Sequence, residues 1–266
     1  MKNIKIMYLL LASFMLIFSA CEPIVEEDHL SDTTDVAGVK LVATQSTPGG
    51  NKITLTMTSP GITGYWDYNL GKALTNEVTV VYPIPGKNTF TYVGTLGSQF
   101  FTKTIDVQID KLDTPLDQDW YDLVSNNTAA GKTWVFYKDN PQANGDGPLW
   151  WFMSPPGNPD GAMGAWWNAG ICCGPSDASG KMHFDLNGAA NYNHYETTTA
   201  TPTKGSFVLD VANKKLIISK SKMLGSAAGN KDGVYTIVEL TQTKMVLYLS
   251  NSETYGTGWT FVFKPL

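Results

Sequence analysis

Apolar and polar residues alternate along short stretches of the first half of the chain, and this period of two is typical of half-buried β-strands. The stretches cover residues 39–43, 52–58, 77–82, 89–93 and 100–109. Turns rich in glycine and proline, such as Pro60-Gly61, separate them. The pattern predicts a small β-sandwich domain over residues 37–113.

The second half of the chain, residues 131–266, repeats this character with more strands. The strand candidates cover residues 132–137, 181–186, 191–197, 206–209, 215–218, 234–240, 245–249 and 259–263. Short connections rich in Gly, Asn and Asp make consecutive strands antiparallel neighbours, as in a meander-like sandwich or a flattened barrel. No long helical period occurs, which excludes α/β folds. We therefore expect an all-β protein whose second domain is a larger antiparallel β-sandwich.

Residues 114–130 link the two domains. Their composition is that of a solvated connection, with clustered carboxylates and room for one helical turn from Trp120 onward.

The first 20 residues have the build of a secretory signal peptide. Lys2 and Lys5 precede an apolar run, and two small residues follow it. The sequence Phe18-Ser19-Ala20-Cys21 resembles the lipobox of bacterial lipoproteins, in which the cysteine is acylated and becomes the first residue. An ordinary signal peptide followed by a chance cysteine is the alternative. The resemblance implies an outer-membrane protein that is anchored in lipid through Cys21 and exposed at the cell surface.

Residues 21–36 form an acidic tether, with carboxylates at Glu22, Glu26, Glu27 and Asp28. Such a run repels itself and stays extended in water. It also resembles the signal that sends some Gram-negative lipoproteins to the cell surface. Both interpretations stay open.

Composition narrows the class of protein. The 266 residues carry a formal net charge of −5, which argues against nucleic acid as a partner, because phosphate binding needs clustered Lys and Arg. The chain holds 8 Trp and 12 Tyr, and a disordered chain lacks such apolar residues.

The cysteines and histidines do not predict a metal site. Besides Cys21, the chain has only the adjacent Cys172 and Cys173, and His183 and His194 lack zinc-finger spacing. The two cysteines form either a vicinal disulfide or two free thiols. Oxygen-bearing residues that could hold Ca²⁺ depart from EF-hand spacing and are expected to be turn residues. These are Asp139, Asn144, Asp146, Asn158 and Asp160. We expect no metal and no cofactor.

Tryptophan is concentrated between residues 120 and 167, which hold six of the eight. Two pairs lie in loops rich in Gly and Pro, and neighbouring residues of an extended chain face opposite sides. One ring of each pair is therefore predicted to be exposed. An exposed indole flanked by polar groups suits a sugar, whose C–H face packs on the ring. The candidate glycan-binding residues are Trp150, Trp151, Trp166, Trp167, Asn168, Asp177, Tyr192 and His194. There are two alternatives. The aromatic residues either pack against their own loop, or they form an interface with a protein partner.

Two family resemblances bear on this interpretation. The Tyr65-Trp66-Asp67 stretch, the segment at residues 80–86 and the strands at 89–93 and 104–109 resemble the polycystic-kidney-disease (PKD) type of immunoglobulin-like domain, which places Trp66 in the core of a spacer. The leader, this spacer and the segments 131–136, 166–169, 180–188 and 258–263 together resemble the surface glycan-binding lipoproteins of polysaccharide-utilisation systems. The resemblance implies a lectin-like second domain and non-catalytic capture of a polysaccharide, with β-glucan the expected class, beside an outer-membrane glycan importer complex.

The acidic residues do not favour catalysis. Glycosidases need two facing carboxylates, and laminarinase-type sandwiches carry theirs two residues apart on one strand. From Gly131 onward no two acidic residues are spaced in that way. We therefore expect no enzyme. The alternatives are a secreted glycoside hydrolase with a laminarinase-like sandwich and a lipoprotein that binds a protein partner as an adhesin or scaffold.

Overall fold

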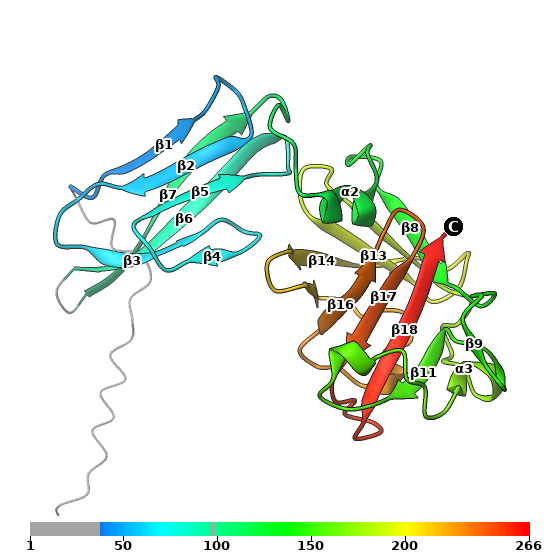
Figure 1. Ribbon diagram of the computed structural model, residues 1–266. Helices are drawn as coiled ribbons and strands as arrows, with labels where there is room; N and C mark the ends of the chain where they lie inside the picture. Colours follow the sequence, from blue (N-terminus) through cyan, green and yellow to red (C-terminus); the bar gives the residue numbers. More distant parts are fainter. Residues whose placement is uncertain (1–37, 97–98) are drawn as a thin grey trace, which may run out of the picture. The chain divides into compact units, whose positions relative to one another are not determined.

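A computed structural model describes residues 38–96 and 99–266 (Figure 1). The predicted signal peptide, the acylation site at Cys21 and the acidic tether lie outside the described residues. Within them, strands dominate and pair antiparallel, so the prediction of an all-β protein is confirmed.

The first domain consists of two antiparallel sheets. Its described strands are β1 (Leu41–Gln45), β2 (Lys52–Met57), β3 (Thr63–Asp67), β4 (Lys72–Ala73), β5 (Glu77–Val81), β6 (Gly86–Leu96) and β7 (Gln99–Ile109). One sheet has the order β1-β2-β5 and the other β4-β3-β6-β7. All five predicted strands are present. The sequence analysis missed β3 and β4, because β3 is short and interrupted by Gly64, and β4 has only two residues.

Trp66 anchors the core of this domain. Its side chain is completely buried, and its indole N–H donates to the carbonyl of Asn76 at 3.1 Å. The ring of Tyr92 meets it edge-on, with the ring centroids 5.2 Å apart, and the Tyr92 hydroxyl binds the Asn76 side chain. The prediction that Trp66 is a buried core residue is confirmed.

The second domain is an eight-stranded barrel. Its strands are β8 (Lys132–Phe136), β12 (Lys181–Asp185), β13 (Asn191–Tyr195), β14 (Thr203–Asp210), β15 (Lys215–Ser219), β16 (Val234–Leu240), β17 (Met245–Leu249) and β18 (Gly258–Pro265). Each pairs antiparallel with the next, and β18 pairs with β8 to close the ring. The predicted β-sandwich is therefore wrong for this domain. Short connections identify neighbouring strands, but they do not determine whether the first and last strands meet.

The barrel closes at Val262, where one edge of β18 changes partner. The Val262 amide donates to the Trp150 carbonyl at 2.8 Å, and its own carbonyl accepts from Tyr137 at 2.9 Å. The β18 residues before Val262 pair with the extra strand β11 (Trp151–Ser154). The β18 residues after Val262 pair with β8. The chain leaves the barrel wall after β8 and returns to the same edge as β11.

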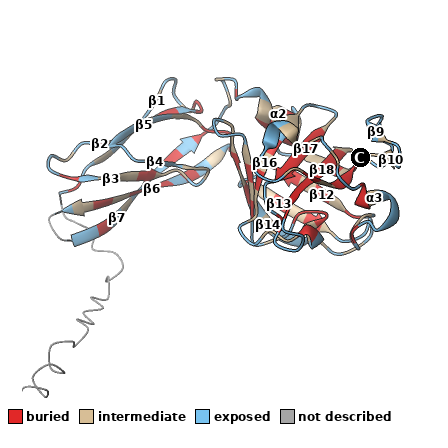
Figure 2. Cartoon of the chain, turned by 60° about the horizontal axis from the view of Figure 1, so that its bottom comes forward, coloured by how far each residue is buried: buried red, intermediate tan, exposed pale blue. Residues whose placement is uncertain are grey.

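The barrel interior is filled by alternate side chains from every strand. Figure 2 shows buried residues along β12, β17 and β18. Large aromatic residues dominate this core: Trp134, Phe136, Trp151, Phe184, Tyr192, Phe207, Tyr235, Trp259, Phe261 and Phe263. The helix α2 (Gln118–Val124) packs against β8, β12 and β16. Its Leu123 is completely buried and accepts a hydrogen bond at 2.9 Å from the indole of Trp134. Part of the predicted linker therefore belongs to the barrel core.

We predict that Leu123→Ala destabilises the barrel by about 2–5 kcal/mol, because it removes a fully buried side chain from a packed core. Leu266→Ala, which truncates an exposed leucine of the same domain, is the control and should change stability by less than about 0.5 kcal/mol. Urea unfolding followed by tryptophan fluorescence measures both. Equal effects of the two substitutions would show that α2 is not part of the cooperative unit.

Candidate functional site

The candidate site lies in the insertion, which we define as residues 137–180 between β8 and β12. Besides β11 it contains β9 (Ala143–Asn144), β10 (Gly147–Pro148), the short helix η2 (Pro159–Gly161) and α3 (Ala169–Cys172). The insertion covers the outer face of β17 and β18, where Leu149 and Phe152 form a second small core with Val246 and Val262. This part of the barrel therefore has apolar packing on both sides of its wall.

The first tryptophan pair is buried. Trp150 is 5% exposed and Trp151 is 2% exposed, so the prediction of one exposed ring in each pair is wrong here. Trp151 enters the barrel, where its ring lies 4.6 Å from that of Trp259 and its indole N–H donates to Gly225. Trp150 packs edge-on against Phe136 at 5.0 Å. The two rings do point to different surroundings, but the insertion itself excludes water from Trp150.

The second pair is displayed to solvent. Trp166 is 62% exposed and Trp167 is 41% exposed. The backbone beneath them is fixed: the Trp166 amide donates to the Met153 carbonyl at 2.8 Å, and the Met153 amide donates to Trp167 at 3.0 Å. Ile171, four residues further on, is also exposed. We call Trp166, Trp167 and Ile171 the aromatic platform.

Buried residues hold this platform in place. Asn168 is 2% exposed, and its side-chain amide donates to the carbonyls of Gly147 and Pro148 at 3.0 and 3.2 Å. Any Cβ added at Gly170 would meet the indole of Trp150, so α3 approaches that ring closely only because this position is glycine. Trp150 and Asn168, both predicted glycan contacts, therefore support the platform from below.

The other predicted polar contacts belong to the barrel interior. His194 is completely buried and its Nε2 lies 3.2 Å from a carboxylate oxygen of Asp177, whose second oxygen accepts from the Gly225 amide at 3.0 Å. The Tyr192 hydroxyl donates to the Lys222 carbonyl, and burial raises its pKa well above the usual value. Tyr192 and His194 alternate with polar residues on β13, and the pattern alone did not show which face is inward.

Cys172 and Cys173 end α3 beside the platform, and both are exposed free thiols. A hydrogen bond between the two side chains raises the pKa of the Cys173 thiol. Within residues 38–96 and 99–266, no three His, Cys, Asp or Glu side chains gather in a way that could hold a metal ion.

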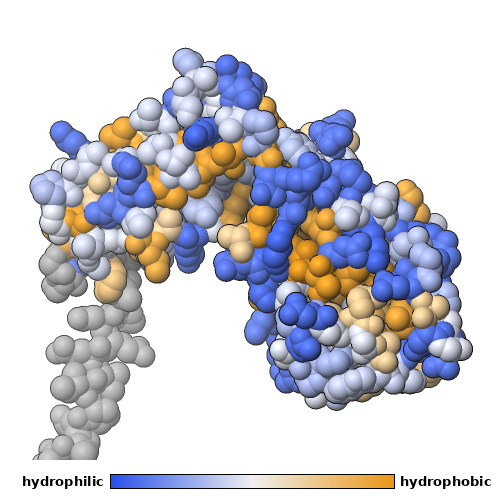
Figure 3. All heavy atoms as spheres, in the orientation of Figure 1, coloured by the Kyte–Doolittle hydropathy of each residue, from blue (hydrophilic) through white to orange (hydrophobic). Residues whose placement is uncertain are grey.

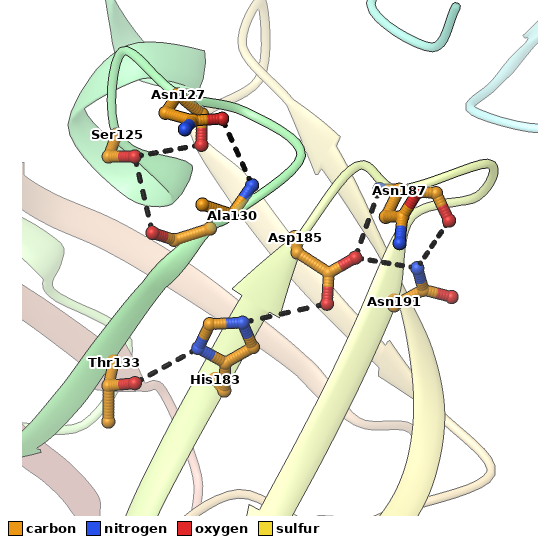
Figure 4. Close-up of polar contacts among 9 residues, drawn as sticks. Ser125, Asn127, Ala130, Thr133, His183, Asp185, Asn187 and Asn191 are labelled. Carbon is orange, nitrogen blue, oxygen red and sulfur yellow. Dashed lines mark hydrogen bonds and ion pairs between the residues drawn. The ribbon is translucent and has the colours of Figure 1, made fainter.

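A polar chain that the sequence analysis did not find joins β8 to β12 (Figure 4). Thr133 Oγ1 and His183 Nδ1 are 2.9 Å apart, and His183 Nε2 lies 3.6 Å from Asp185. The order hydroxyl, imidazole, carboxylate is that of acyl-transfer triads, but the second distance exceeds a hydrogen bond. Thr133 and His183 are register partners. Asp185 in turn accepts from Asn187 and Asn191 at the next turn. The chain is a cross-strand tie that fixes this end of the barrel.

The chain matches none of the known protein family models, and comparison with curated proteins found no relative. None of the helices in the described residues has the length and apolar character that crossing a bilayer requires.

The two tryptophan pairs predict opposite effects of truncation. Trp151→Ala should cost about 3–5 kcal/mol of stability, because it empties a large space in the barrel core. Trp166→Ala should change the unfolding free energy by less than about 0.5 kcal/mol, because its ring is already in water. Urea unfolding of both variants tests this, and a large loss of stability in Trp166→Ala would mean that the platform is packed rather than displayed.

Proposed function

We propose that the barrel domain binds an extracellular polysaccharide on the aromatic platform and does not cleave it. The exposure of two adjacent indoles on a fixed backbone carries this proposal. Leaving two aromatic rings in water costs free energy. Aromatic residues that a rigid scaffold presents on a loop are typical of a binding surface. In the space-filling view, hydrophobic patches bordered by hydrophilic residues lie on the visible face of the barrel domain (Figure 3). Tryptophan is not coloured as hydrophobic on the scale of this view, so these patches do not mark the two indoles.

An open pair of rings suits a chain-like sugar polymer. The C–H faces of successive sugar units can pack on Trp166 and Trp167, and the hydroxyl groups stay free to bind polar neighbours and water. Such a surface accepts the middle of a long chain, whereas a closed pocket takes only an end. A β-linked glucan has the flat, extended shape that this arrangement favours, and it remains the expected class of ligand.

The hydroxyl partners are expected on the β9–β10 hairpin. An added Cβ at Gly147 would meet Ile171 of the platform at 3.2 Å, so the hairpin borders it. The tip carries Asn144 and the exposed Asp146, and the Asp146 amide binds the Asn144 side chain at 3.0 Å. These two residues replace the buried Asn168, Asp177, Tyr192 and His194 in the proposed set of direct contacts.

The remaining parts of the chain fit a surface lipoprotein. We propose that the first domain is a PKD-type immunoglobulin-like spacer and that acylated Cys21 anchors it in the outer membrane, beside a glycan importer complex. The two-sheet core around Trp66 supports the first part of this proposal. Acyl chains supply the anchor, since each buried CH₂ contributes about 0.8 kcal/mol.

A protein partner is the second candidate for the platform. Ile171 is 49% exposed beside the two rings, and an aliphatic side chain adds little to a sugar site but is common in protein interfaces. The polysaccharide test below distinguishes the two ligands.

We predict that Trp166→Ala and Trp167→Ala each weaken polysaccharide binding by about 5- to 150-fold, the equivalent of about 1–3 kcal/mol for one stacked ring by analogy with bases on aromatic side chains. Phe100→Ala, which removes an exposed aromatic ring from the first domain, should leave binding unchanged. Affinity electrophoresis against a panel of polysaccharides measures the binding.

Reducing-end assays on the same samples test for cleavage. Retardation by a glycan without new reducing ends is the expected result. New reducing ends would make the protein a hydrolase. If no glycan retards the wild-type protein, the platform does not bind polysaccharide and the protein-partner candidate is favoured.

The lipid anchor predicts that a fatty-acid probe labels the wild-type protein in cells and does not label Cys21→Ala. Cys172→Ala is the matched control, because it removes an exposed thiol that lies far along the chain from the leader. Equal labelling of the wild type and Cys21→Ala would contradict the lipoprotein proposal.

A further inference from the structure

A cavity lies at the connection between β15 and β16, residues 220–233, which contains the short helix η3 (Ser226–Ala228). Its volume is about 390 Å³, within the range of pockets that bind small ligands. The buried Tyr235 is one of its lining residues, together with Ser219, Ser226 and Asn230.

The lining of the cavity holds more lysines than carboxylates, in a protein that is acidic overall. Its lining contains Lys220, Lys222 and Lys231 but only one carboxylate, Asp232, whereas the whole chain has a formal net charge of −5. Carboxylates outside the lining already neutralise two of the lysines: Lys222 binds Glu196 at 2.5 Å, and Lys231 lies 3.8 Å from Glu253. For Lys220, no carboxylate within 4.0 Å is found among the described residues.

The backbone at Lys220 has an unusual conformation. Its φ is +60°, in the left-handed region that residues with a Cβ rarely adopt. Strained backbone of this kind persists where the surroundings impose it, and it is concentrated at binding sites. Gly233 closes the base of the loop against the carbonyl of Ile218, where an added Cβ would clash with that oxygen. The ends of the loop are thus held together, and Lys220, an exposed lysine without a carboxylate partner among the described residues, is one of the residues that line the cavity.

The hydroxyl of Tyr235, a lining residue of the cavity, carries no negative charge that would repel an anion. Burial raises the pKa of Tyr235 to about 12, so the side chain is neutral at physiological pH. Hydroxyl and amide groups can donate hydrogen bonds to an oxyanion, and a bond to a charged group is stronger than one between neutral groups.

We infer that this cavity binds an acidic substituent of a glycan, either the carboxylate of a uronic acid or a sulfate ester, with Lys220 as its cationic partner. The identification of the ligand as a glycan rests on the proposed function, whereas the binding of the anion does not. The site would let the protein bind glycans that carry such groups in addition to the neutral glucan expected on the platform. Its failure and that of the platform are separable, because they lie on different elements and are removed by different substitutions.

Calorimetric titration of the full chain with glucuronate, inorganic sulfate and glucose tests the site. Glucuronate or sulfate should bind and glucose should not, and the preferred anion identifies the substituent. Lys220→Gln should weaken anion binding about tenfold or more, because it removes the positive charge while it keeps a polar side chain at this position. Lys52→Gln, an exposed lysine of the first domain, makes the same change in net charge and should have no effect. Raised salt should weaken binding through screening.

Three results would overturn this inference: no binding of either anion to the wild-type protein, binding of glucose as tight as that of glucuronate, or equal losses in the two lysine variants. Trp166→Ala should keep its anion binding while losing affinity for neutral polysaccharide. A wild-type protein that binds neutral polysaccharide but neither anion would leave the platform proposal intact and remove the second site alone.

Discussion

The closure of the barrel along β18 is the constraint on which the rest of the second domain depends. An open sheet would leave the backbone groups of two edge strands unpaired, and such edges pair readily with other chains. Here one edge of β18 is shared between β8 and β11, with the change of partner at Val262. Because β8 covers only part of that edge, the chain can leave the wall for the insertion and still return to complete the pairing.

This arrangement explains how one loop can be both buried and displayed. The return strand β11 carries Trp151 into the core, directly after the buried Trp150, and its residue Met153 then fixes the backbone of the second pair outside. The backbone of the platform therefore continues the barrel wall through a single antiparallel β-bridge between Met153 and Trp167. A surface built on a strand loses less conformational entropy when it binds than a free loop does, because its backbone is already ordered. The loop around the β15–β16 cavity is likewise ordered, because the two neighbouring strands fix its ends.

Much of the fold could be predicted from the sequence, because period-two alternation is a local signal. It placed all eight strands of the barrel wall and five strands of the first domain, but not the extra strand β11. Closure could not be predicted in this way, since it depends on contact between β8 and β18, which are more than 100 residues apart. Short segments such as β4, β9 and β10 have too few residues to show a period.

The candidate site was predicted only in part for similar reasons. The concentration of tryptophan identified the insertion, and Trp166 and Trp167 are exposed within it. The number of aromatic residues does not reveal burial, so the predicted exposure of one ring of the pair Trp150 and Trp151 was wrong, whereas the core position predicted for the other ring was right. Nearness along the chain also misled the choice of Asp177 and His194, which face the barrel interior. The sequence does not indicate Lys220 as a binding residue, because an isolated lysine in a turn is ordinarily solvated.

The central claim is that the exposed indoles of the insertion form the ligand surface. Nuclear magnetic resonance of protein labelled with nitrogen-15 at tryptophan observes each indole N–H separately, with single Trp→Phe variants providing the assignments. On titration with soluble β-glucan oligosaccharides, we expect the signals of Trp166 and Trp167 to shift together in a saturable way, while those of the buried Trp134, Trp151 and Trp259 stay in place. Saturable shifts confined to the buried indoles, or no shift at Trp166 and Trp167 with oligosaccharides of any polysaccharide that the protein binds, would contradict it.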